Sequence, residues 1–219
     1  MGDLIPISDE QAKAVQEGFK LAGQTLETAR DFGGYLAKIL GTLPEDLVGL
    51  LGADWVRMKR VENITDMAVE AFARLEARGV KEPQPVPLSV ALPLLKEAAD
   101  ENREELVDLW ARLMAAAMDP ARSKKTRQTF IIAIKGMDPL DALVFSKLSD
   151  PMPSLQGNPA PYFANLLSVN YSEVELSLLR LIEIGCIRDM DAPLQTVVLS
   201  INRIALTPLG RELLRILSD

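Results

Sequence analysis

Histidine is absent from this chain of 219 residues, and cysteine occurs only once, at Cys186. Without histidine, the chain cannot build a catalytic triad with a histidine base or a histidine-ligated metal site. A single cysteine forms no intrachain disulfide, so nothing in the sequence indicates an oxidising compartment. Residues 1–6 also lack the basic and apolar regions of a signal peptide. We therefore expect a cytoplasmic protein.

Motifs that bind phosphates or activate a nucleophile are missing as well. The sequence contains no Gly-Lys-Ser/Thr loop, no Gly-x-Gly-x-x-Gly turn, no pair of cysteines for zinc and no Gly-x-Ser-x-Gly elbow. Cys186 stands between Ile184 and Ile187 and is typical of a buried core thiol. From these absences we predict no enzymatic activity and no cofactor.

Long hydrophobic runs are missing too, although the composition is that of a globular protein, with 48% hydrophobic and 25% charged residues. Residues 33–52 come closest to a membrane segment, but Lys38, Pro44, Glu45 and Asp46 interrupt them. We expect no stable insertion, and keep a membrane-active effector that uses 33–52 as an alternative. The net charge of −7 opposes binding to a phosphate backbone unless basic residues cluster.

The spacing of the apolar residues that are present predicts a mainly α fold class. Apolar positions recur every three or four residues, as on one face of a helix. Three prolines in 81–87 predict an extended connector, and 150–161 is typical of a surface loop. The helices are predicted over 53–79, 88–100, 102–118, 126–135, 138–148, 172–185 and 207–217.

An N-terminal helix is predicted from Ser8 to Leu40, where apolar and small residues follow a heptad period. Two interpretations stay open. The favoured one is an internal helix pair, because 219 residues suffice to cover the helix within one chain. The other is an oligomer seam, with candidate residues Ala22, Leu26, Ala29, Gly33 and Leu36.

The last third of the chain is predicted to be a winged-helix-like module. Three helices are followed by a short strand at 186–188, a β-hairpin and a helix that begins at Thr207. The predicted domains are an N-terminal helical region (1–82), a central helical segment (83–137) and this module (138–219). A capping box at Ser172 and Glu175 is predicted to open the third helix, with an exposed face of Glu173, Glu175, Ser177, Arg180 and Glu183.

Charge argues against DNA binding by this module. From Asp138 onward there are six basic and ten acidic residues, and the third helix is itself acidic. Because neutralisation of phosphates supplies most non-specific affinity, we do not expect binding to duplex DNA. A nucleic-acid-binding regulator that uses the winged helix remains an alternative.

Three segments resemble the abortive-infection alpha (Abi-alpha) family of bacterial proteins. They are 94–120, which contains Leu109-Trp110-Ala111, together with 136–142 and 204–217, which contains Thr207-Pro208-Leu209-Gly210. The central segment is the most specific of the three. The resemblance implies an association with phage defence. It implies no catalytic residues.

Two charged clusters are candidate binding sites. The basic run Arg122, Lys124, Lys125 and Arg127 is a candidate anion-binding site, although such runs are more often solvated loops. An acidic cluster could hold Mg²⁺, but it is more typical of a solvated helix face. Its members are Asp100, Glu101, Glu104, Glu105 and Asp108.

The sequence as a whole predicts a non-enzymatic defence protein. We expect it to act through contacts with a protein partner or with its own copies as a homo-oligomer, without a metal.

Overall fold

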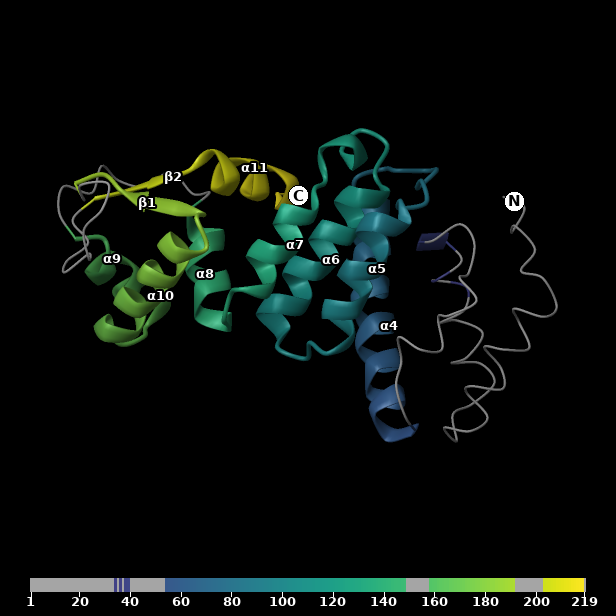
Figure 1. Cartoon of the computed structure of the whole chain (residues 1–219), viewed down its shortest axis with the longest axis horizontal. Coiled ribbons are helices and arrows are strands. Elements are labelled where there is room, and N and C mark those ends of the chain that lie inside the picture. The colour runs from purple at the N-terminus through teal and green to yellow at the C-terminus, as the bar shows by residue number, and fades with distance from the viewer. Residues whose placement is uncertain are drawn as a thin grey trace. The chain divides into compact units, whose positions relative to one another are not determined.

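The computed structural model describes residues 34, 36, 38, 39, 54–148, 158–191 and 203–218 (Figure 1). These residues fall into two compact units. Unit 1 is the described part of Met1–Asn102 together with Trp110–Gln128, and unit 2 is Arg103–Leu109 with the described part of Thr129–Ser218. The described residues are mainly helical, with one small antiparallel sheet near the C-terminus. The expected mainly α fold class is confirmed.

Helix α4 (Asp54–Ala77) forms a long side of unit 1 and packs against α5 (Leu88–Ala99). Its buried residues follow the predicted three- and four-residue spacing: Val61, Ile64, Ala68, Ala71 and Leu75. Gly79 follows the helix with a φ of +71°, a left-handed conformation that glycine adopts without steric cost. A bidentate ion pair from Arg60 to Asp100, with N–O distances of 2.6 and 2.9 Å, joins α4 to the end of α5.

Helix α5 contains Pro93 in its interior. Proline has no N–H, so the carbonyl of Ser89, four residues earlier, loses its usual helical donor. The side-chain amide of Gln128 takes that place, donating to the Ser89 oxygen over 2.7 Å. The proline is therefore tolerated because a residue distant in the sequence supplies the missing hydrogen bond.

Helix α6 (Glu104–Met118) is the most buried helix of the described chain. Every residue from Leu109 to Met118 is buried except Arg112. The helix ends at Asp119, whose carboxylate accepts the Ala121 N–H over 2.8 Å. A short 3₁₀ helix, η1 (Ser123–Lys125), and helix α7 (Gln128–Lys135) follow.

Unit 2 contains four further helices and two strands. Helix α8 (Pro139–Lys147) starts with a capping box between Asp138 and Asp141, and α9 (Ala160–Leu167) and α10 (Tyr171–Glu183) come next. Helix α10 packs on both α8 and α9. Strands β1 (Ile187–Asp189) and β2 (Ile204–Leu206) pair antiparallel, with Ile187 opposite Leu206, and helix α11 (Pro208–Leu217) follows β2.

The segment 207–210 fastens α11 to the turn after α10. The Thr207 N–H donates to the Cys186 carbonyl over 3.0 Å, and the Thr207 hydroxyl donates to the Gly185 carbonyl over 2.5 Å. The same hydroxyl oxygen accepts the Gly210 N–H over 3.1 Å, as an N-cap does. Gly210 lies so close to the Cys186 carbonyl that a Cβ there would fall inside van der Waals contact with its oxygen. The threonine and the glycine therefore have identifiable structural roles.

Two local predictions are wrong. The predicted loop 150–161 ends too late, because α9 begins at Ala160 and Pro161 occupies its first turn, where a missing N–H costs nothing. The N-cap of α10 is Asn170, in a capping box with Glu173, and not Ser172 with Glu175. Residues 172 and 175 have the right types and spacing, but the helix begins two residues earlier.

Several predictions lie outside the described residues. These are the N-terminal seam apart from Leu36, almost all of 33–52, and most of the hairpin between β1 and β2. The winged-helix assignment and the boundaries at 82 and 137 stay predictions. The order of α8, α9, α10, β1, β2 and α11 agrees with the expected order of helices and strands.

Candidate interaction surfaces

The basic run lies in unit 1, in the turn between α6 and α7. We call residues 122–127 the basic turn. Arg122 lies 3.7 Å from the Asp119 carboxylate, which satisfies part of its charge locally. Lys124, Lys125 and Arg127 are exposed, and none of them forms an ion pair with any described residue. Three positive charges are therefore available to a binding partner.

A hydrophobic residue is held beside this turn. The bond from Gln128 to the Ser89 carbonyl joins the end of the turn to the start of α5. Leu88, the first residue of α5, is 44% exposed there. Unit 1 therefore has an exposed apolar residue on the segment that is hydrogen-bonded to the end of the basic turn, and this combination suits an acidic partner with its own apolar residue.

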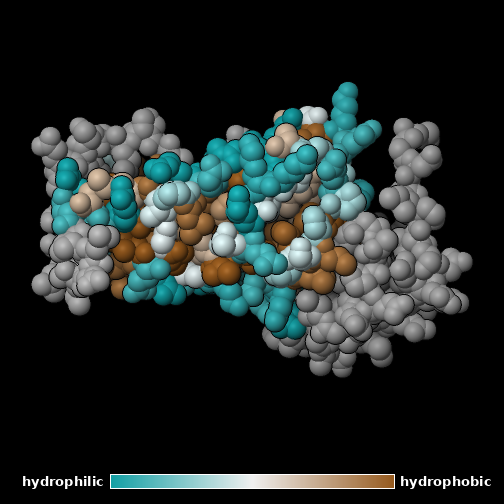
Figure 2. Space-filling model, turned by 45° about the horizontal axis from the view of Figure 1, so that its top comes forward, coloured by the Kyte–Doolittle hydropathy of each residue, from teal (hydrophilic) through white to brown (hydrophobic). Residues whose placement is uncertain are grey.

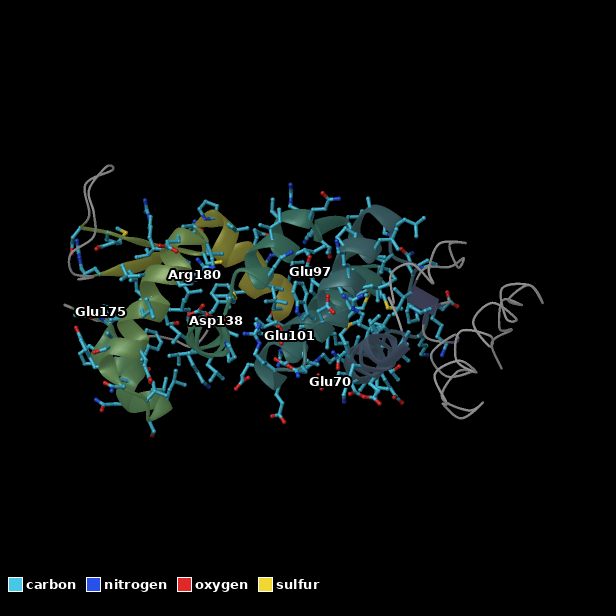
Figure 3. All side chains as sticks on the ribbon, turned by 60° about the horizontal axis from the view of Figure 1, so that its bottom comes forward. Glu70, Glu97, Glu101, Asp138, Glu175 and Arg180 are labelled. Atoms are coloured by element: carbon cyan, nitrogen blue, oxygen red, sulfur yellow. The ribbon has the colours of Figure 1, made fainter. Side chains whose placement is uncertain are left out.

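In unit 2, α10 has a buried side and an exposed side of different chemistry. Val174, Ser177, Leu178 and Leu181 are buried. Ser177 was predicted to be exposed, and that prediction is wrong: its hydroxyl donates to Asp141 over 2.6 Å within the core. The exposed side carries Glu173, Glu175, Leu176, Arg180 and Glu183; Figure 3 labels Glu175 and Arg180 on this helix.

We call Glu173, Glu175 and Leu176 the acidic face of α10. Leu176 is 69% exposed, whereas a leucine on a surface helix normally turns toward the core. The Glu173 carboxylate accepts the Asn170 N–H, and that of Glu175 accepts the Tyr171 hydroxyl over 3.3 Å. Neither glutamate pairs with a cation among the described residues. The two carboxylates repel DNA phosphates, and together with the leucine they suit a basic, partly apolar partner.

A groove of about 390 Å³ lies between α7, the C-terminal half of α10 and the start of α11. Its lining is mostly apolar, and Ile132 on its rim is 70% exposed. The guanidinium of Arg180 spans it, donating to the Gly136 carbonyl over 3.0 Å and to Glu183 over 3.1 Å. Figure 2 shows hydrophobic side chains reaching the surface of unit 2 between hydrophilic ones. The groove can accommodate apolar side chains of a partner.

Asp141 and Ser177 form a polar link inside unit 2. The Asp141 carboxylate accepts the Ser177 hydroxyl and, over 2.8 Å, the Asp138 N–H. Burial raises the pKa of Asp141, and these two hydrogen bonds oppose the shift only in part. One oxygen joins α8 to α10 and the other caps the start of α8, so this carboxylate has a structural role.

The residues of the predicted acidic cluster have separate structural roles. Asp100 pairs with Arg60, and the buried Glu101 accepts the Asn102 N–H over 3.0 Å. Glu104 and Glu105 occupy the first turn of α6, where negative charge favours the helix dipole. Among the described residues, no group of three or more His, Cys, Asp or Glu side chains could hold a metal ion.

The lone thiol is buried and weakly acidic. Cys186 is fully shielded from solvent, and burial raises its pKa to about 12. A thiol with so high a pKa is hardly ionised at neutral pH, and the thiolate is the nucleophilic form. Cys186 therefore belongs to the core, as the sequence predicts.

Little of the predicted seam and membrane segment can be placed. Of the seam, only Leu36 is described, and it is fully buried; Ala22, Leu26, Ala29 and Gly33 lie outside the described residues. Ile39 is likewise buried, and its carbonyl accepts the Val86 N–H over 2.7 Å. Among the described residues, no helix is both long enough and apolar enough to cross a membrane.

Two exposed residues, Leu176 and Ile132, were missed by sequence reasoning. The signal for Leu176 lies in the helical phase of α10. At 100° per residue, position 176 falls about 160° from the direction of Val174 and at least 100° from that of Ser177, Leu178 and Leu181. A helical projection therefore places this leucine opposite the apolar side of the helix.

Comparison with known proteins identifies a family. The family model for abortive infection alpha matches residues 59–217, well over half of the chain. The match covers α5 to α11 completely, and with them the basic turn, the acidic face and the groove. No curated protein and no solved structure matches the chain.

Proposed function

Because this chain belongs to the abortive infection alpha family, we propose that it is a phage-defence protein that acts through protein–protein contacts and not as an enzyme. The family associates the chain with abortive infection, and the proposal concerns how it acts. The observation that carries it is the exposed leucine of the acidic face, with the apolar groove further along the same helix. Exposed apolar residues framed by charges are typical of protein-binding surfaces.

The chemistry of α10 favours a protein partner over duplex DNA. A reading helix in the major groove needs donors and positive charge toward the phosphates. Here Glu173 and Leu176 are exposed and Glu175 is half-buried beside them instead. The only basic residue of α10, Arg180, is occupied by Gly136 and Glu183. We propose the cytoplasm as the location, which fractionation of expressing cells would test.

A plaque assay tests the proposal. Bacteria that express the chain are challenged with a panel of phages, and the efficiency of plating is compared with that of cells carrying an inactive control. We expect the wild-type chain to protect against at least one phage. Leu176→Asp should reduce protection at least about tenfold, because it removes an apolar anchor from the centre of a contact surface.

A matched control is offered by Val69, on α4 of unit 1, which is 46% exposed. Val69→Asp makes the same kind of change outside the proposed surface and should leave protection unchanged. Equal loss in both variants, or full protection by Leu176→Asp, contradicts the proposed surface. Loss of protection on changing Glu104 and Glu105 to glutamine, in a folded protein, would contradict the non-enzymatic assignment.

A further inference from the structure

We propose that the acidic face of α10 binds a second copy of this chain, which presents its basic turn and Leu88. This inference rests on the proposed function and names the partner of the same surface. Each of the two surfaces has unpaired charge and an exposed leucine, and the inference makes each the ligand of the other. The acidic face has negative charge near Leu176, and the basic turn has positive charge near the segment that carries Leu88.

The first step is the state of the acidic face. Both glutamates bond only to their own helix start, to Asn170 and Tyr171, and neither has a cationic partner in the described chain. Leu176 stands next to Glu175 and is 69% exposed. A partner that covers the leucine must also compensate the two carboxylates, because burying an unpaired charge is strongly unfavourable.

The second step is the state of the basic turn. Lys124, Lys125 and Arg127 are exposed and form no ion pair in the part of the chain that the structure describes. The hydrogen bond from Gln128, the residue after the turn, to the Ser89 carbonyl connects the turn to the start of α5, where Leu88 is exposed. The basic turn and Leu88 therefore offer the positive charges and the apolar contact that would complement the acidic face.

The two surfaces are complementary in sign and similar in composition, so opposite charges guide the approach and the leucines exclude water at the centre. They are also different surfaces, so each contact pairs unlike surfaces of two copies. Such contacts make a two-fold dimer where each copy's turn meets the other's helix, and otherwise larger rings or open chains. An open chain leaves one surface of each kind free, one at either end.

The experiment measures the assembly of the full-length, nuclease-treated chain by light scattering and sedimentation. Two variants reverse the charge of one surface each: Lys124→Glu with Lys125→Glu on the basic turn, and Ser172→Lys with Glu175→Lys on α10. Ser172 is exposed, and the capping residue Glu173 is left intact. The control, Lys96→Glu with Arg188→Glu, makes the same change in net charge as the basic-turn variant, at exposed residues elsewhere.

We expect wild type and control to assemble alike at tens of micromolar, and each surface variant to associate at least about tenfold more weakly. An equimolar mixture of the two surface variants should regain assembly, because the acidic turn of one then faces the basic helix of the other. That rescue requires contact between different chains. Circular dichroism verifies that each variant is folded.

Four results would overturn the inference: a wild-type chain that stays monomeric, surface variants that assemble normally, a mixture that stays dissociated, or assembly that disappears on nuclease treatment. The last would identify nucleic acid as the ligand of the basic turn. The plaque assay separates this inference from the proposed function. A monomeric chain whose protection depends on Leu176 retains the function and loses the inference, whereas an assembling chain without protection does the reverse.

Discussion

Helices α6 and α10 are similar in length, with 15 and 13 residues, but differ in what surrounds them. From Leu109 to Met118, α6 is buried on all sides except at Arg112. Helix α10 is buried on one side only, and its other side exposes Leu176 between acidic residues. The first pattern is typical of an interior helix. The second is typical of a surface helix that exposes an apolar residue.

The difference separates the residues that carry the family resemblance from those of the proposed contact surfaces. The segment 94–120, whose resemblance to the family is most specific, contains α6 and therefore consists largely of core residues. The threonine and glycine of segment 207–210 hold α11 in place. The residues with free charge or an exposed apolar side chain lie mainly between these motifs. Resemblance to the family therefore identifies the fold more directly than it identifies the proposed contact surfaces.

The largest effect is expected from truncating the interior helix. Trp110 is 2% exposed, and Trp110→Ala should lower the free energy of unfolding by about 3–5 kcal/mol, since it removes a buried aromatic and leaves a cavity. Leu176→Ala, on the exposed side of α10, should change it by less than about 0.5 kcal/mol. Urea unfolding followed by circular dichroism measures both. Similar losses in the two variants would mean that Leu176 is covered within the folded chain, and the comparison would fail.

Most helices were predictable because their signals are local. Capping residues such as Asp138 and Thr207, the glycines at 79 and 185, and apolar spacing act within a few residues of the elements they define. The basic turn was predicted as a candidate for the same reason, and its role as a binding site stays a prediction.

Other features depend on partners distant in the sequence. Pro93 argues for a kink or a helix start, and only the bond from Gln128 explains why α5 passes through it. Ser177 is a polar residue expected on the surface, and only Asp141, 36 residues away, makes its burial favourable. Likewise, no local signal brings Leu88 next to the basic turn. The candidate surfaces could therefore be predicted in part, and their apolar components could not.

An intermediate effect is expected at Gly210, which tests whether the 207–210 segment is structural. A Cβ there collides with the Cys186 carbonyl, part of a backbone that cannot rotate away. Gly210→Ala should therefore cost about 2–3 kcal/mol of unfolding free energy, in the upper range for overpacking. Gly79→Ala is the control, because Gly79 has open space around it and a φ of +71°. It should cost only the conformational strain, about 1 kcal/mol. A Gly210 variant no less stable than wild type would leave the glycine unexplained.

The smallest effect concerns the buried side of α10 and depends on pH. Burial raises the pKa of Asp141 above the ordinary value of 3.8, against hydrogen bonds from Ser177 and Asp138 and attraction by Arg180. The folded state therefore holds this proton more tightly than the unfolded chain does. The stability that this provides is complete below 3.8 and is lost as pH rises through the raised pKa.

Asp141→Asn removes this titration while keeping an amide that can accept from Asp138 and bond to Ser177. The unfolding free energy of wild type minus that of Asp141→Asn should therefore fall as pH rises from 3.8 upward, measured by urea unfolding at a series of pH values. Asp191→Asn provides a control of opposite sign, because the hydrogen bond from Arg203 lowers the pKa of Asp191. Its difference should grow as pH rises through the lowered pKa toward 3.8. If the Asp141 difference also grew with pH, the carboxylate would be better stabilised as an anion than its burial implies. The hydrogen bonds from Ser177 and Asp138 would then outweigh the effect of burial.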